Sequence, residues 1–175
     1  VVGDTGFENR NIAAVLSGAY YLAAQQLNLD TKLVFQKVKS RGDVADEDIV
    51  NSLSELPDRN VIILNMSDKL GSIKDLGKSF RKWSKKKSHR FVSAMSLGDL
   101  NTDKVGAITD AIDVSYKPFQ ASHKRLREQF DSTDEIHVTT EAGTDLYYNI
   151  KGINGISADG NYTSPGSGGN LPAGE

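Results

Sequence analysis

The chain has no cysteine among its 175 residues. This absence excludes disulfides, zinc–thiolate sites, iron–sulfur clusters and thiol nucleophiles. A metal ion would therefore have to be held by aspartate, glutamate or histidine. There are three histidines, His89, His123 and His137, and no two of them show the His-Glu-x-x-His or His-x-His spacing that places two ligands on one element.

The chain also lacks a strong charge of one sign and a long hydrophobic run. Its formal net charge of −2 creates no field that would make nucleic acid or an anionic membrane the expected partner. The longest apolar stretch, residues 12–27, is interrupted by Ser17, Gly18, Gln25 and Gln26, so it is too short and too polar to span a bilayer. It also lacks the flanks of a signal peptide. We therefore expect a cytoplasmic protein, and both ends of the chain read as cut ends.

Strand and helix patterns alternate through the first two thirds of the chain. Short apolar runs predict strands at residues 1–3, 32–38, 61–64 and 90–94, and apolar residues at helical spacing predict helices at 11–27, 46–56, 73–86 and 118–130. The run at 61–64 is typical of a strand buried on both faces of a parallel sheet. This alternation predicts an α/β domain with a parallel, flavodoxin-like or Rossmann-like sheet over residues 1–115, then a connecting helix over 116–133.

The pattern changes at residue 134. Two β segments, 136–141 and 146–151, flank Ala-Gly-Thr-Asp at 142–145, which is a hairpin signature. Residues 152–175 hold seven of the sixteen glycines, and residues 164–169 are typical of a loop. We therefore predict that residues 134–175 begin a second, antiparallel β-containing domain that is truncated here.

Three polar loops follow predicted strands, and their polar residues include Asp4, Asn65, Ser67 and Ser96. Ligands bind beyond the carboxyl ends of strands in open parallel sheets, so these side chains outline a candidate ligand crevice, although ordinary polar loops give the same pattern. Residues 3–6 contain neither a GxGxxG nor a Walker sequence, which disfavours nucleotide binding. Asn65 stands where a phosphorylated receiver domain would need an aspartate.

Two further groups of polar side chains have more ordinary interpretations. His137 shares one face of its predicted strand with Thr139 and Glu141, and a solvent-facing polar row explains this better than a metal site. A block of basic residues without an intervening acid surrounds Phe80 and Trp83; it comprises Lys78, Arg81, Lys82, Lys85, Lys86, Lys87 and Arg90. Such a block can grip phosphates or a peptide carboxylate, but it favours the solvated face of an outer helix.

The last quarter of the chain resembles a known enzyme family. Residues 135–146 read Glu-Ile-His-Val-Thr-Thr-Glu-Ala-Gly-Thr-Asp-Leu, residues 147–152 read Tyr-Tyr-Asn-Ile-Lys-Gly, and residues 169–175 read Gly-Asn-Leu-Pro-Ala-Gly-Glu. In this order and spacing, the three motifs resemble the aminopeptidase T family of thermophile-type metallopeptidases, also called leucyl aminopeptidases. Residues 1–130 match that family in layout and not in motif.

The resemblance implies a homodimeric, metal-dependent aminopeptidase that releases amino-terminal residues from short peptides. It makes Glu175 a ligand of a divalent metal, Zn, Co, Mn or Mg, and it implies that a second glutamate, two histidines and an aspartate come from sequence outside these 175 residues. One carboxylate cannot hold such an ion well. We therefore expect this segment alone to be inactive, and we assign no catalytic residue within it.

Two other functions stay open at this point. Ring-cleaving dioxygenases that act on a dihydroxypyridine with a single iron are similar to the same family in fold and in the metal-loop glutamate. A non-catalytic, flavodoxin-like module that binds a small ligand in the strand-end crevice without a metal is the third alternative.

Overall fold

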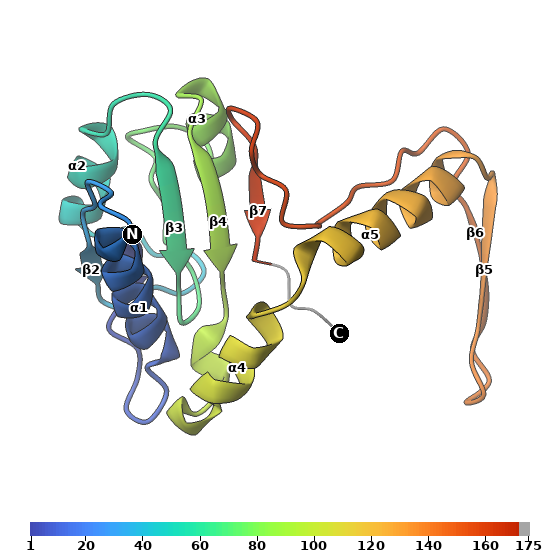
Figure 1. Cartoon of the computed structure of the whole chain (residues 1–175), viewed down its shortest axis with the longest axis horizontal. Helices are drawn as coiled ribbons and strands as arrows, with labels where there is room; N and C mark the ends of the chain where they lie inside the picture. The colour runs from blue at the N-terminus through green and yellow to red at the C-terminus, as the bar shows by residue number, and fades with distance from the viewer. Residues whose placement is uncertain (172–175) are drawn as a thin grey trace. The chain divides into compact units, whose positions relative to one another are not determined.

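The computed structural model describes residues 1–171 of the chain, which form two compact units (Figure 1). Residues Val1–Val114 and the described residues from Tyr162 onward form an α/β unit, and Ser115–Asn161 form a smaller helix–hairpin unit. In sequence, the helix–hairpin unit is therefore inserted between the last helix and the last strand of the α/β unit.

A five-stranded parallel sheet forms the centre of the α/β unit. Its strands are β1 (Val2–Asp4), β2 (Val34–Gln36), β3 (Val61–Asn65), β4 (Arg90–Ala94) and β7 (Gly168–Asn170), in the spatial order β2-β1-β3-β4-β7. Every neighbouring pair is parallel. With β7 as the fifth strand, this is the 2-1-3-4-5 order of flavodoxin-like sheets, whose connections change direction between β1 and β3.

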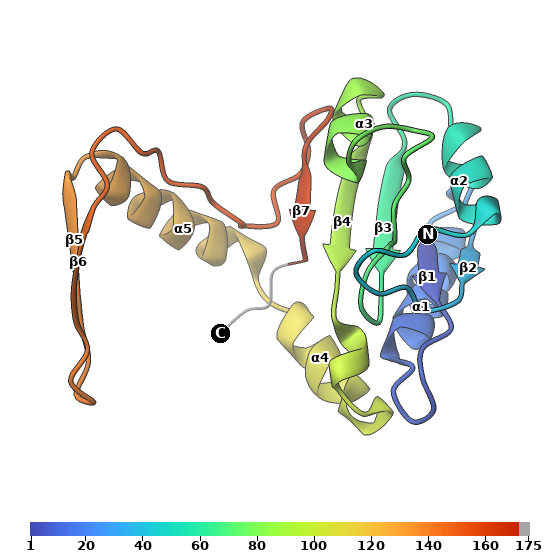
Figure 2. The ribbon, with the colours of Figure 1, turned by 180° about the vertical axis from the view of Figure 1, so that it is seen from behind.

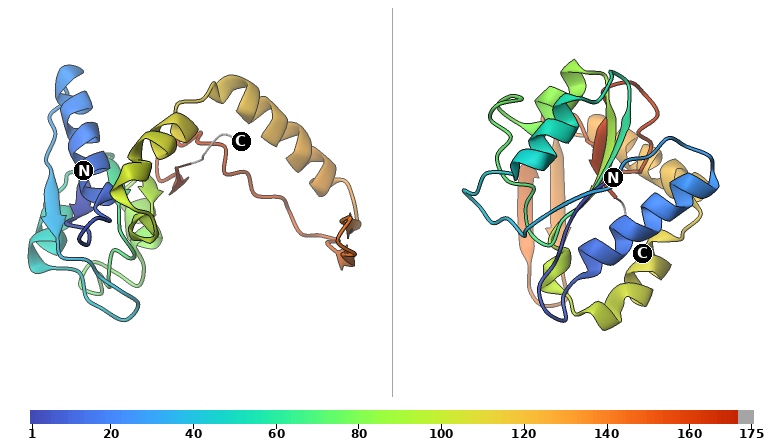
Figure 3. Two further views of the ribbon diagram at one scale, coloured as in Figure 1. Left: turned by 90° about the horizontal axis from the view of Figure 1, so that it is seen from below. Right: turned by 90° about the vertical axis from the view of Figure 1, so that its left-hand side faces the viewer.

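Helices cover both faces of this sheet (Figure 3). On one face lie α1 (Ile12–Gln26) and α4 (Val105–Ile112), with a small core that contains Ile12, Ala13, Leu16 and Leu97. On the other face lie α2 (Glu47–Ser54) and α3 (Phe80–Lys86), with a larger core that includes Ile49, Leu53, Ile62, Leu64, Trp83 and Phe91. Alternate residues of a strand point to opposite faces, which explains why Ile62 and Leu64 share one core.

Two short 3₁₀ turns, Leu97–Asp99 and Thr102–Lys104, connect β4 to α4. In the described part of the chain, no helix combines the length and the apolar character needed to cross a bilayer.

The helix–hairpin unit consists of α5 (Tyr116–Asp131) and the antiparallel pair β5 (Glu135–Thr139) and β6 (Asp145–Asn149). The hairpin turn is closed by hydrogen bonds between Thr140 and Thr144 and between Gly143 and Thr140. Gly143 has a φ of +95°, a conformation that glycine adopts without strain. None of residues 115–161 is buried, so this unit contains no core of its own.

The α/β fold class predicted from the sequence is confirmed, as are the first four strands and the hairpin. The helix predicted at residues 73–86 forms only from Phe80 to Lys86. The preceding residues make a turn, in which the Leu76 and Gly77 amides donate to the Ile73 carbonyl and Gly77 has a φ of +156°. Residues 168–170, which the sequence analysis grouped with the segment from 134 onward, pair with β4 instead.

Candidate functional site

The residues of the candidate crevice end or follow strands at the carboxyl edge of the sheet, the edge toward which the strand arrows point (Figure 2). β1 ends at Asp4 and β3 at Asn65, and these two strands are neighbours, with Gly3 paired to Asn65. The sheet order also changes direction between β1 and β3, and ligands of such sheets bind at this switch point. The fold therefore places Asp4, Asn65 and the loop that contains Ser67 at the position expected for a ligand site.

Asp4 is fully buried, and its carboxylate is occupied by neighbouring donors. The Ser67 hydroxyl donates to Oδ1 at 2.5 Å, the Ser67 amide donates to Oδ2 at 2.6 Å, and the Gly6 amide donates to Oδ1 at 3.0 Å. A buried carboxylate is costly unless hydrogen bonds compensate it, and here three of them do so. Asp4 therefore ties the loop after β1 to the loop after β3.

Asn65 and Ser17 form a second buried contact beside Asp4. The Asn65 side-chain amide donates to Ser17 Oγ at 3.2 Å, and both side chains are buried. Gly3 permits this approach, because a Cβ at residue 3 would lie 2.4 Å from Ser17 Oγ. Asn65 therefore holds α1 against the sheet.

The loop after β4 closes on the same edge. The Leu97 amide donates to the Met66 carbonyl and the Gly98 amide donates to the Ser67 carbonyl, at 3.1 and 2.9 Å. Ser96 adopts a left-handed conformation, with a φ of +60°, and is exposed. The structure thus brings Asp4 and Ser67 into direct contact and leaves Ser96 at the surface. The three buried polar residues of the candidate crevice, Asp4, Asn65 and Ser67, form hydrogen bonds with other protein groups.

The motif at residues 169–175 begins at this same edge. Ser93 Oγ donates to Asn170 Oδ1 at 3.1 Å, and the Leu171 amide donates to the Ser93 carbonyl at 2.7 Å. The Tyr162 hydroxyl donates to the Asn170 carbonyl at 2.9 Å. β7 therefore delivers the chain to the carboxyl edge beside β4, whereas Glu175, the predicted metal ligand, lies outside the described residues.

The described residues do not supply a metal-ligand set: residues 1–171 contain no group of three histidine, aspartate or glutamate side chains placed to hold an ion. His137 is instead paired with Asp145, with 2.6 Å between Nε2 and Oδ1, and its ring stacks on Tyr147 at a centroid distance of 4.0 Å. His123 packs on Phe119. Both of these histidines are thus engaged with neighbouring side chains.

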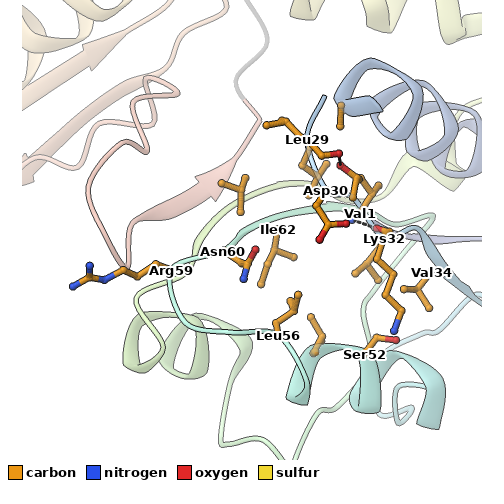
Figure 4. Close-up of a pocket in the computed structure, with 16 residues that line it drawn as sticks. Val1, Leu29, Asp30, Lys32, Val34, Ser52, Leu56, Arg59, Asn60 and Ile62 are labelled. Atoms are coloured by element: carbon orange, nitrogen blue, oxygen red, sulfur yellow. Dashed lines mark hydrogen bonds between the residues drawn. The ribbon is translucent and has the colours of Figure 1, made fainter. Parts of the chain in front are cut away.

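A cavity of about 300 Å³ lies at the opposite, amino edge of the sheet (Figure 4). Its lining includes the apolar side chains of Val34, Leu53, Leu56 and Ile62, with Lys32 beside them. Sequence reasoning missed this hollow, because the switch-point rule directs attention to the carboxyl edge. Leu29 and Val61, which line the cavity, are exposed apolar side chains, and local sequence patterns do not reveal that exposure.

Comparison with known proteins gives a likeness of fold. No family model and no curated protein matches this chain. A solved structure of 2,5-dihydroxypyridine dioxygenase from Pseudomonas putida KT2440 is similar, with a TM-score of 0.62 and 12% sequence identity. The likeness covers 99% of this chain and 47% of that protein, so the chain spans about half of its length. At this identity the likeness concerns the fold alone.

Proposed function

We propose that this chain is the amino-terminal portion of a metal-dependent aminopeptidase that acts on short peptides, in which Glu175 contributes to the metal site. The observation that carries the proposal is the placement of β7. The residues Asn170 and Leu171, which open the motif that ends in Glu175, lie at the carboxyl edge of a flavodoxin-like sheet. That edge is where such folds place their ligands.

In this proposal the buried polar residues of the α/β unit have a structural role, and Glu175 and residues outside these 175 hold the metal. Asp4, Asn65 and Ser67 bond to protein groups, so their role is to fix the carboxyl edge. The metal would be Zn, Co, Mn or Mg, held by Glu175 together with residues outside these 175. A bound divalent metal polarises a peptide carbonyl and activates water. A homodimer in the cytoplasm and inactivity of residues 1–175 alone belong to the same proposal.

A second function is favoured by the structural comparison. The dioxygenase likeness extends over 99% of this chain, including the helix–hairpin unit and β7. The alternative is therefore a ring-cleaving dioxygenase that uses a single iron ion. The third alternative, a binding module without a metal, has less support, because the buried side chains of its crevice are already hydrogen-bonded to one another and to the backbone.

One experiment separates these functions. The full-length protein, stripped of metal, is assayed for leucine-p-nitroanilide hydrolysis after addition of Co, Zn, Mn or Mg, and for oxygen-dependent loss of 2,5-dihydroxypyridine with Fe(II). We expect metal-dependent hydrolysis that Glu175→Ala lowers by more than about 100-fold, since losing even an outer-shell partner costs 10–100-fold. Glu141→Ala, at the exposed hairpin turn, is the matched control and should keep full activity.

Two outcomes would exclude the aminopeptidase, and a third would exclude only the role of Glu175. Loss of 2,5-dihydroxypyridine without peptide hydrolysis would identify the dioxygenase. Absence of both activities with every metal would leave the binding module. Equal activity of Glu175→Ala and Glu141→Ala would remove Glu175 from the metal site.

A further inference from the structure

The strongest local charge in the molecule lies on and around α3. Seven basic residues occupy positions 78–90 without an acid between them; this basic surface comprises Lys78, Arg81, Lys82, Lys85, Lys86, Lys87 and Arg90. The whole chain has 21 basic and 23 acidic residues, so outside the basic surface 14 basic residues face 23 acidic ones. The near-zero net charge therefore conceals a strongly positive region on an otherwise acidic molecule.

The structure turns these cations outward. Trp83 and Ser84 are buried, and Phe80 packs edge-on against Phe91 with ring centroids 5.1 Å apart. Lys78, Arg81, Lys82, Lys85 and Lys86 are all exposed. Side chains four residues apart lie on the same face of a helix, about 6 Å apart along its axis. Arg81 with Lys85 and Lys82 with Lys86 thus form two rows on the outer face of α3, and Lys78 precedes the helix. The Phe80 and Trp83 rings anchor the inner face.

Most of this charge has no internal partner. Among the described residues, the only ion pair made by the basic surface joins Lys87 and Asp58, at 3.1 Å. Arg81 lies over the Phe91 ring, 5.5 Å from its centroid, and keeps its charge. Like charges four residues apart destabilise a helix. The arrangement therefore costs folding stability, and an anionic partner would recover that cost.

The helix α3, which carries Arg81, Lys82, Lys85 and Lys86, lies toward the amino edge of the sheet (Figure 2). The Arg59 amide donates to the Lys87 carbonyl at 3.0 Å, which places one more cationic residue beside the basic surface. The motif at residues 169–175 begins at the opposite edge, where β7 ends at Asn170. The basic surface is thus separate from the site of the proposed peptidase.

The composition of the basic surface indicates the class of partner. Protein–protein interfaces are depleted in lysine and need apolar anchors, but five of the seven cations are lysines, and no large hydrophobic side chain between residues 78 and 90 is exposed. One exposed apolar side chain, Val61, borders the surface as the strand partner of Arg90. Insertion into a membrane needs a free apolar helix face, and the apolar face of α3 is packed in the core. Nucleic-acid interfaces are polar and strongly positive, as this surface is.

We propose that the basic surface binds the phosphate backbone of double-stranded nucleic acid without regard to sequence. Single strands are held largely by base stacking on aromatic rings, and both rings of α3 face the core. Lysines act on phosphates as point charges, which gives affinity and no base recognition. The sequence alone favoured a solvated helix face. The exposed cations without an ion-pair partner lead us to propose a nucleic-acid partner as well.

The test is a titration of a fluorescent 20-base-pair DNA duplex with the full-length protein at several salt concentrations. With five exposed cations in contact, the logarithm of the binding constant should fall against the logarithm of salt with a slope of about −4.5. The triple variant K78Q/K82Q/K86Q should reduce that slope by about 3 and weaken binding at least about tenfold. The matched control R41Q/K117Q/R125Q removes the same charge from exposed positions elsewhere and should bind as the wild type does.

The proposal would be overturned if the duplex did not bind at low salt, or if the two triple variants lost affinity equally. It would also be overturned if polyglutamate displaced the duplex as effectively as unlabelled duplex does, or if the protein bound anionic vesicles more tightly than the duplex. A thermal unfolding scan of each variant excludes misfolding as the cause of a loss. The readout requires neither metal nor catalysis, so failure here and failure of the peptidase proposal are distinguishable.

Discussion

The carboxylate of Asp4 is an internal acceptor at the point where three loops meet. Its three hydrogen bonds satisfy the amides of Gly6 and Ser67 and the Ser67 hydroxyl. A polar residue after a strand can be predicted to lie at the ligand-binding edge. Whether it faces a ligand or a neighbouring loop depends on its contact partner, and Ser67 lies 63 residues from Asp4 in the sequence. Local sequence patterns carry no information about contacts over that separation.

Asp4→Ala should lower the free energy of unfolding by roughly 3 kcal/mol, because each buried donor left without a partner costs about 1–3 kcal/mol. Urea denaturation measures this change. Asp30→Ala removes an exposed carboxylate and should change stability by less than about 0.5 kcal/mol. Equal effects of the two substitutions would show that the Asp4 contacts do not hold the loops.

His89 is the second residue whose burial has a measurable consequence. It is fully buried, Nδ1 accepts the Asn60 amide at 3.1 Å, and Nε2 has no hydrogen-bond partner among the described residues. Desolvation lowers the pKa of His89, an effect that Asp58 opposes and Lys87 reinforces. The imidazole is therefore held neutral against the Trp83 ring.

Protein stability should consequently fall below neutral pH. The pKa of histidine in the unfolded chain is about 6.5 and that of folded His89 is lower, so the unfolded state binds the proton first as the pH drops. The His89 contribution is complete above about pH 6.5 and decreases below it until the folded pKa is reached. The difference in unfolding free energy between wild type and His89→Gln should therefore decrease from pH 7.5 to pH 5, and a difference that stays constant over this range would contradict it.

At the scale of elements, β7 is the feature that sequence reasoning missed. Its three residues, Gly-Gly-Asn, have low strand propensity, so its extended form comes from pairing with β4. The other four strands carry apolar side chains and were predictable for that reason. α4 also escaped prediction, although Val105, Ile108 and Ile112 recur at helical spacing within its eight residues.

The absence of a side chain at residue 168 allows β7 to approach Phe91. A Cβ there would lie 2.2 Å from Phe91 Cδ1, and Phe91 is itself fixed by Phe80 and Arg81. Gly168→Ala should therefore lower the free energy of unfolding by about 1–3 kcal/mol through overpacking. Gly18→Ala, inside α1 with open space at its Cβ, should raise it by about 0.5–1 kcal/mol. Denaturant titrations that gave both variants the same sign would refute this account.

At the scale of the whole molecule, the composition and the alternation of strand and helix patterns predicted the α/β class. They do so because the burial of apolar side chains repeats regularly along each strand and helix. They did not predict a helix–hairpin unit without a buried residue, since its apolar side chains show ordinary periodicity in the sequence. Exposed members of that set include Leu126, Val138, Leu146 and Tyr148. The candidate metal ligand Glu175 was named from motif resemblance and lies beyond the described residues, so it stays a prediction.

The late position of β7 in the chain sets an order of events during synthesis. Ser93 and Asn170, which face each other across β4 and β7, are 77 residues apart in sequence. At translation rates of 5–20 residues per second, β4 leaves the ribosome about 4–15 s before its partner. Throughout that interval β4 is the exposed edge strand of the sheet, and it can pair with strands of other nascent chains. Capture by a chaperone at this stage would govern the yield of folded protein.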